Sequence, residues 1–190
     1  WKNTKPQAEL DEMREANERK NRNLRRLCKM ARAWKNKHGV AMGGLLIDTL
    51  AYNFLESTDK YDTKSYHYYD YMCRDFFEFL ADQPKQSEYA ALGSRQRVRV
   101  KKRFERKAKK AYDLCLKAID ASGQKNERQN WRDVFGNAYP APAKSAAGEA
   151  AAFTHVFKNT EQFVEDRFPV DIRYHLRINC EVTQDGFRPG

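Results

Sequence analysis

Four basic side chains between residues 22 and 32 recur every three or four positions, the spacing that places side chains on one face of a helix. The members of this cationic ridge are Arg22, Arg25, Lys29 and Arg32. A second helix is expected to begin shortly afterwards, at Gly43 and Gly44. Cationic side chains attract phosphate, and glycines let a phosphate approach the free N–H groups at a helix start. The pattern therefore predicts a phosphate-binding site.

Two helices must position these residues. The polar stretch after Pro6 predicts one long helix over residues 7–37, ended by Gly39. Its apolar residues share one stripe, which we expect to be buried: Leu24, Leu27, Ala31 and Trp34. The next helix, over residues 43–56, is nearly all apolar on its inner faces. Asp48 within it needs a partner when buried, and an arginine of the basic helix is the expected one.

The rest of the first 139 residues also favours helices. Apolar residues at helical spacing predict a third helix over 66–81, which Pro84 stops. Ser94 is interpreted as the N-cap of a long basic helix over 94–121, and a short helix is expected over 127–135. The inner stripe of the long helix comprises Val100, Phe104, Ala108, Ala111, Cys115 and Ala118. The predicted fold class is mainly α, a bundle of about five helices.

The composition changes after residue 139. Proline, alanine and glycine dominate residues 140–152, which are typical of a linker. Between residues 169 and 184, apolar and polar residues alternate strictly, and this period of two indicates a half-buried β-strand. A single strand is not stable alone. We therefore expect a partial β-containing segment that opens a second, incomplete domain.

Charge and hydropathy limit the partners. The 190 residues carry a formal charge of +10, which favours an anionic partner. No apolar run approaches the roughly 18 residues of a membrane span, and the start lacks the apolar segment of a signal peptide. We expect a cytoplasmic protein without a membrane partner. The cysteines and histidines are scattered, which favours buried free thiols over a metal site: Cys28, Cys73, Cys115 and Cys180; His38, His67, His155 and His175.

Two further patterns each allow two interpretations. The basic run over residues 95–110 is either a nucleic-acid track or the solvated outer face of a helix, and we favour the solvated face. The aromatic residues between 66 and 79 could stack on bases, but their helical spacing favours core packing.

Several separate motifs occur in an order that resembles a known family. They are Trp1-Lys2-Asn3-Thr4-Lys5-Pro6-x-x-Glu9, the stretch 27–55, Tyr89-x-x-Leu92-Gly93-Ser94, Lys107-Ala108-x-x-Ala111, Trp131-x-x-Val134-Phe135-Gly136, and the stretches 160–174 and 180–190. With these motifs the chain resembles bacterial CD-NTases, the cGAS/DncV-like nucleotidyltransferases that make cyclic oligonucleotide second messengers in anti-phage (CBASS) defence.

The resemblance implies a domain organisation. Residues 1–139 are similar to the helical substrate-binding lobe, which is related to the C-terminal domain of oligoadenylate synthases. Residues 153–190 look like the start of an AGS-C sensor domain, after the linker at 140–152. The implied partners are ATP- or GTP-type ribonucleotides and a catalytic lobe that precedes Trp1 in a longer protein.

The catalytic residues of the family have no match here. Family catalysis uses a Gly-Ser turn followed by paired carboxylates that hold Mg²⁺ or Mn²⁺. Gly93-Ser94 is followed instead by Arg95-Gln96-Arg97. We therefore expect no catalytic or metal-binding residues in this chain, and no nucleotidyltransferase activity from it alone.

The resemblance also implies which residues contact nucleotide. A basic residue two positions before a helix tryptophan contacts the donor triphosphate in the family, and the matching residue here is Arg32. A second phosphate contact, at the start of the next helix, falls on Gly43 or Gly44. Lys29 of the cationic ridge completes the expected nucleotide-binding set. Arg32 could instead be a solvated or ion-paired arginine.

Two other functions stay open. The chain could be a stand-alone basic helical module that binds nucleic acid without chemistry, or a helical protein-interaction module. Steep salt dependence of nucleic-acid binding would favour the first of these. Saturable nucleotide binding that depends on Arg32 would favour the enzyme lobe.

Overall fold

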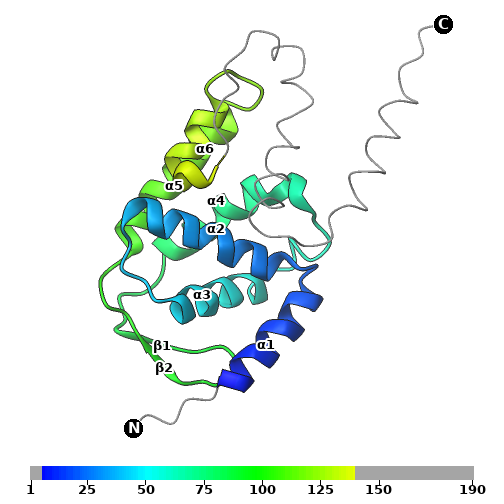
Figure 1. Cartoon of the computed structure of the whole chain (residues 1–190), viewed down its shortest axis with the longest axis vertical. Coiled ribbons are helices and arrows are strands. Elements are labelled where there is room, and N and C mark those ends of the chain that lie inside the picture. The colour runs from blue at the N-terminus through cyan, green and yellow to red at the C-terminus, as the bar shows by residue number, and fades with distance from the viewer. Residues whose placement is uncertain (1–5, 140–190) are drawn as a thin grey trace, which may run out of the picture.

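Six α-helices and one short β-hairpin build residues 6–139, the part of the chain that this computed structural model describes (Figure 1). The helices are α1 (Pro6–Arg19), α2 (Asn23–His38), α3 (Gly44–Glu56), α4 (Tyr69–Ala81), α5 (Glu105–Asp120) and α6 (Glu127–Phe135). The strands are β1 (Glu88–Ala90) and β2 (Arg97–Arg99), and one 3₁₀ turn precedes α4 and another follows α6. The expected mainly α fold is confirmed. The predicted linker at 140–152, strand at 169–184 and sensor domain at 153–190 lie outside the described residues.

The single long helix predicted over 7–37 is wrong, because the chain breaks between α1 and α2. Asn21 and Arg22 adopt left-handed backbone conformations, with φ of 50° and 61°. The Asn17 side-chain oxygen accepts the backbone N–H of Arg25 at 3.0 Å, and so caps the first turn of α2. Asn17, Asn21 and Arg22 are polar and would also suit the exposed face of a helix, but in the structure they form the break and its cap.

The loop between α3 and α4 holds this break in place. The Nζ atom of Lys20 donates to the Thr58 carbonyl at 3.2 Å, and the Asn23 side-chain amide donates to the carbonyls of Tyr61 and Lys64 at 2.8 and 2.9 Å. Lys20 and Asn23 are both buried. Buried polar groups without partners are costly, so these bonds fix the direction in which α1 leaves α2.

The start of the basic helix, predicted at Ser94, is also wrong. Residues 88–99 form an antiparallel hairpin in which Glu88 faces Arg99 and Tyr89 faces Val98, and α5 begins only at Glu105. Arginines alternate with less polar residues along 95–100, and this period of two matches a strand. Long basic side chains also favour helices, which concealed the alternation.

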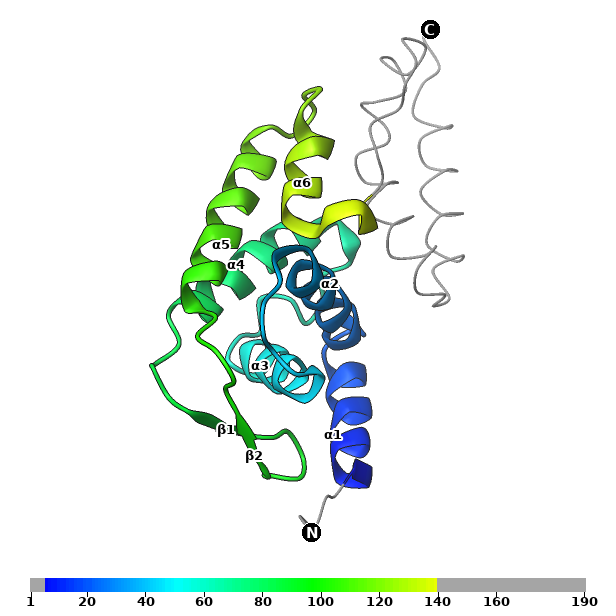
Figure 2. The ribbon, with the colours of Figure 1, turned by 60° about the vertical axis from the view of Figure 1, so that its left-hand side comes forward.

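The hairpin is anchored to two helices. Ser94 donates a hydrogen bond from its hydroxyl to the carboxylate of Glu9 on α1 at 2.7 Å. The backbone N–H of Leu92 donates to the hydroxyl of Thr49 on α3 at 3.4 Å. Figure 2 shows the hairpin and the start of α1 at one end of the molecule and α6 at the other.

The remaining helix predictions agree closely with the structure. Helix α3 begins one residue later than expected, and α6 has the expected bounds. The helix predicted over 66–81 begins with a 3₁₀ turn at Tyr66–Tyr68, and α4 follows it. The stripe of α5 is buried as predicted, apart from Val100, which precedes the helix and is partly buried. Cys28, Cys73 and Cys115 are buried free thiols, whereas Cys180 lies outside the described part of the chain.

Helix α2 supplies the centre of the core. Leu24, Leu27, Ala31 and Trp34 are all buried, as their spacing predicts. The rings of Trp34 and Phe77 lie 5.0 Å apart, in contact between α2 and α4. The aromatic residues between 66 and 79 mostly lie in the core. Tyr68, just before α4, and Tyr71, in its first turn, are exposed. Within residues 6–139, no helix is long and apolar enough to cross a membrane.

Candidate functional site

The outer face of α2 carries the cationic ridge, and the structure divides the ridge into two parts. The apolar stripe turns toward the core, which leaves the basic side chains on the outer side of the helix. Arg22, Arg25 and Lys29 line a groove beside α1. Arg32, one turn further along, pairs with a residue of α3.

Arg32 forms an ion pair with Asp48. Its Nη2 atom lies 2.6 Å from one carboxylate oxygen of Asp48 and 2.8 Å from the other. The Arg32 side chain is 40% exposed and that of Asp48 is 21% exposed. Burial acts to lower the pKa of Arg32, but the adjacent Asp48 raises it above its ordinary value. The arginine partner expected for Asp48 is confirmed, and Arg32 is ion-paired, the alternative that the sequence left open for it.

The start of α3 lies beside Arg32. A Cβ atom added to Gly44 would lie 3.7 Å from Nη2 of Arg32. No side chain caps α3, and the helix ladder begins with the bond from the Ile47 N–H to the Gly43 carbonyl at 3.1 Å. The first N–H groups of α3 thus precede the ladder, at the positive end of the helix dipole. The Arg32 guanidinium and the positive end of the α3 dipole would both attract an anion that approaches this helix start.

The two glycines leave this helix start open. A Cβ atom at Gly43 would meet nothing within 4 Å, and both residues are exposed. The structure therefore brings together three of the predicted nucleotide-binding residues, Arg32, Gly43 and Gly44.

Lys29, the fourth predicted residue, belongs to the groove rather than to the α3 start. Burial lowers its pKa, and repulsion from Arg25, Arg26 and Arg32 lowers it further. The groove is an open hollow of about 450 Å³ between α1 and α2. Its basic lining consists of Arg14, Arg22, Arg25, Arg26 and Lys29. Asn17 and Glu18 complete this basic groove, so a single carboxylate side chain faces these five cations.

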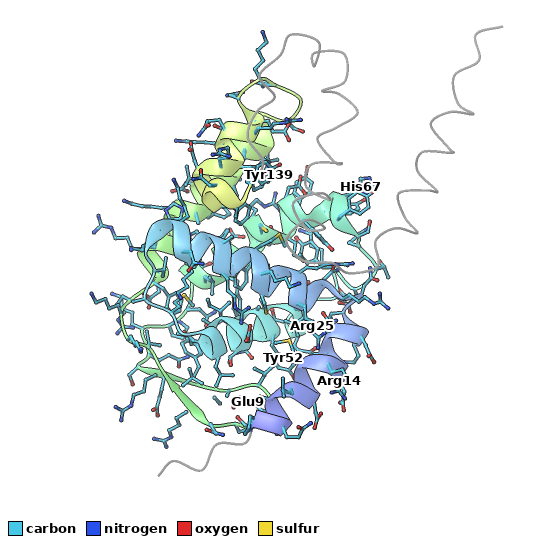
Figure 3. All side chains as sticks on the ribbon, viewed as in Figure 1. Glu9, Arg14, Arg25, Tyr52, His67 and Tyr139 are labelled. Carbon is cyan, nitrogen blue, oxygen red and sulfur yellow. The ribbon has the colours of Figure 1, made fainter. Side chains whose placement is uncertain are left out.

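Two basic residues of the groove, Arg14 and Arg26, were not predicted from the sequence. Arg14 lies on α1, before the unpredicted break at residues 20–22. Figure 3 shows Arg14 and Arg25 where α1 and α2 meet. Arg26 follows Arg25 directly, but it also lies four residues after Arg22 and three before Lys29. The polar residues around residues 20–22 are the feature of the sequence that could have indicated the break.

The basic run over residues 95–110 does not form one helix face. It is divided among the end of the hairpin, a connecting loop and the first turns of α5. Four of its side chains bind other parts of the chain: Arg97 to Glu88, Arg103 to Glu105, Lys109 to Asp113, and Lys107 to the carbonyls of His38 and Gly39. The other six are exposed: Arg95, Arg99, Lys101, Lys102, Arg106 and Lys110.

Within residues 6–139, no group of three or more histidine, cysteine, aspartate or glutamate side chains could hold a metal ion. Comparisons with models of known protein families, with curated proteins and with solved structures find no match for this chain. The α3 start and the basic groove are therefore the two candidate sites of residues 6–139.

Proposed function

We propose that this chain supplies the nucleotide-binding helical lobe of a nucleotidyltransferase that joins ribonucleoside triphosphates into a cyclic oligonucleotide signal for anti-phage defence. One observation carries the proposal. Arg32, held by Asp48, lies beside the uncapped, glycine-flanked start of α3. A resemblance of several ordered motifs to the CD-NTase family supports the same function.

Each residue has a distinct part in holding the triphosphate. The Arg32 guanidinium donates charge-assisted hydrogen bonds to phosphate oxygens, and Asp48 fixes its direction by binding Nη2. The first N–H groups of α3 donate to the same phosphates, because no side chain at Gly43 or Gly44 blocks them. Lys29, one turn before Arg32 on α2, adds positive charge on the approach.

The metal ions that the family uses are Mg²⁺ or Mn²⁺. Both oxygens of Asp48 bind Arg32, and the described residues offer no cluster of carboxylates for an ion. The residues of this site therefore do not fit a two-metal centre. We assign them binding and orientation of the nucleotide, and no metal-dependent step.

Calorimetric titration of the chain with ATP and with GTP tests the proposal. A charge-assisted contact to phosphate contributes about 1.5 to 3 kcal/mol, so Arg32→Ala should weaken binding roughly tenfold to a hundredfold. Arg99→Ala removes an exposed arginine of β2 and should change the affinity less than about twofold. The same ratio is expected for kcat/KM in the parent enzyme.

A paired variant separates the loss of the contact from damage to the fold. Arg32→Ala leaves Asp48 without its cation, whereas Arg32→Gln with Asp48→Asn keeps a neutral polar pair at the same place. Weak nucleotide binding by both variants, with unchanged thermal unfolding of the paired variant, supports the proposal. Equal small effects of Arg32→Ala and Arg99→Ala would place the nucleotide on another face.

The chain alone should yield no oligonucleotide. We expect mass spectrometry to detect no product after incubation with the four ribonucleoside triphosphates and Mg²⁺. Authentic product from pure chain would show that these residues perform the chemistry themselves.

The exposed cations of the basic run favour a second candidate, a nucleic-acid-binding module. Steeply salt-dependent binding of duplex or single-stranded nucleic acid, lost in Lys101→Ala with Lys102→Ala and kept in Arg32→Ala, would favour that function over the enzyme lobe.

A further inference from the structure

The basic groove gathers cations from three successive segments. Arg14 lies on α1, Arg22 lies in the break, and Arg25, Arg26 and Lys29 lie on α2. Lys29 is the one residue that the groove shares with the nucleotide site proposed above, because Arg32, Gly43 and Gly44 lie outside the lining.

The charges of the groove are poorly compensated within the described part of the chain. Among residues 6–139, no carboxylate forms an ion pair with Arg22 or Arg25. The nearest acidic atom to Arg14, on Asp11, is 3.9 Å away, at the limit of an ion pair. The Nε atom of Arg26 is buried without a hydrogen-bond partner. Like charges held this close repel one another, and an anion between them would reverse that effect.

The backbone holds the cations together despite their repulsion. Asn21 and Arg22 keep left-handed conformations that are unfavourable for residues with a side chain. The hydrogen bonds of Lys20 and Asn23 to the loop at 57–64 maintain this break. The lowered pKa of Lys29 agrees with a positive field in the groove, since Arg25 and Arg26 contribute to it after burial.

We propose that the basic groove is a second anion site, which binds the linked phosphates of a compact polyphosphate. A volume of about 450 Å³ lies in the range of small-molecule sites. Glu18 on the wall disfavours a long polyanion that would pass over it. The lining contains no aromatic side chain on which a base could stack, so the phosphate chain is the group that is recognised.

Two sources can supply linked phosphates: an inorganic polyphosphate and the tail of a nucleoside triphosphate. The test is calorimetric titration of the whole chain with sodium tripolyphosphate, with ATP, and with a single-stranded oligonucleotide. Saturable tripolyphosphate binding assigns the phosphate chain as the ligand. Tighter binding of ATP than of tripolyphosphate, lost in the groove variant, would name the nucleotide as the source.

The decisive variant combines Arg14→Ala with Arg25→Ala, two exposed residues outside the nucleotide site. Each lost charge-assisted contact should weaken tripolyphosphate binding roughly tenfold, so we expect a loss of about a hundredfold. The matched control, Arg99→Ala with Lys102→Ala, removes the same charge from exposed positions of the basic run. It should change binding less than about threefold.

The results that would overturn this inference differ from those that would overturn the proposed function. Loss of tripolyphosphate binding in Arg32→Ala, with full binding in the groove variant, would overturn the inference and leave the α3 start as the phosphate site. Equal losses in the groove variant and its control would also overturn it, as general attraction to a basic protein. Loss in the groove variant alone supports it, whatever Arg32→Ala does to ATP binding.

Discussion

Two basic regions of this chain differ in what their charges contact. In the basic run over 95–110, Arg97, Arg103, Lys107 and Lys109 bind carboxylates or carbonyls of the same chain. In the basic groove, five cations converge on one hollow that contains a single carboxylate side chain. The first region uses part of its charge to hold the fold, whereas Arg22 and Arg25 of the second form no ion pair with a described residue.

The difference depends on which segments converge and only weakly on the number of charges. The cations of the basic run are spread over the end of the hairpin, a connecting loop and the first turns of α5. At the α1–α2 break, two helices meet at an angle and direct their arginines into the space between them. Local charge density therefore predicts solubility, whereas convergence in space predicts a binding site.

The largest effect should come from the glycine that brings the basic run against α1. Gly93 has a φ of 64°, and an added Cβ would lie 2.1 Å from the carbonyl oxygen of Ala8. Gly93→Ala should therefore lower the free energy of unfolding by about 3 kcal/mol, from steric overlap and an unfavourable backbone conformation. Urea denaturation measures the change.

Gly43→Ala is the matched control, because a Cβ there meets nothing within 4 Å. It should change stability by less than about 0.5 kcal/mol. Similar small effects of both substitutions would mean that the hairpin does not pack on α1 and that the basic run is free to move.

The next prediction concerns a third charged cluster, in which one carboxylate compensates two cations. Oδ2 of Asp75 lies 2.6 Å from Nζ of Lys60 and accepts a hydrogen bond from the Tyr61 hydroxyl at 2.5 Å. Oδ1 of Asp75 lies 2.6 Å from Nη2 of Arg74. Burial acts to raise its pKa, but these three bonds lower the pKa below its ordinary value. The cluster should therefore stabilise the folded state by about 2 kcal/mol near neutral pH.

The sign of its pH dependence follows from the lowered pKa. The unfolded chain binds a proton at a higher pH than the folded chain does, so this stabilisation is complete above the unfolded pKa. It is lost as the pH falls through the lower folded pKa. Asp75→Asn should thus destabilise the protein near pH 7 by about 2 kcal/mol and have little effect well below about pH 4.

Urea denaturation of both proteins at several pH values tests this prediction. Asp113→Asn, which breaks the exposed pair with Lys109, is the control and should change stability little at every pH. A constant difference for Asp75→Asn at all pH values would show that packing, and not charge compensation, gives Asp75 its effect.

A smaller effect is expected from the lysine of the basic run that caps α2. Lys107 donates to the last carbonyls of α2, at 2.7 Å to His38 and 2.9 Å to Gly39. Lys107→Ala should lower stability by about 0.5 to 1 kcal/mol, because these carbonyls lie at the negative end of the helix dipole. Lys110→Ala, on the same helix and exposed, should change it little. Equal unfolding midpoints of the two variants would show that Lys107 does not cap α2.

The helices that bury an apolar face were predictable from the sequence, and the breaks between them were not. The stripes of α2 and α5, the bounds of α6 and the partner of Asp48 follow from helical spacing and from the cost of a buried charge. The break at Asn21 and Arg22 depends on hydrogen bonds to a loop about forty residues later. Local propensity contains no information on such distant partners.

The candidate site was predictable to the same extent. Arg32 and the two glycines lie on neighbouring helices whose approach follows from their apolar faces, and the structure brings them together. The basic groove was only half predictable. Arg25 and Lys29 belong to the predicted ridge, whereas Arg14, which lies before the unpredicted break, and Arg26 were not predicted.

The smallest predicted effect is also the one with the opposite sign. Arg25 is exposed and makes no ion pair within the described residues, and it contributes to the lowered pKa of Lys29. Arg25→Ala should therefore raise stability by a few tenths of a kcal/mol at low salt, because it relieves repulsion in the groove. High salt should abolish this gain by screening the charges. NMR titration should show that the pKa of Lys29 rises toward its ordinary value, since one of its repelling neighbours is gone. A loss of stability comparable to that of Lys107→Ala would instead mean that Arg25 makes a stabilising contact, and the contrast between the two basic regions would disappear.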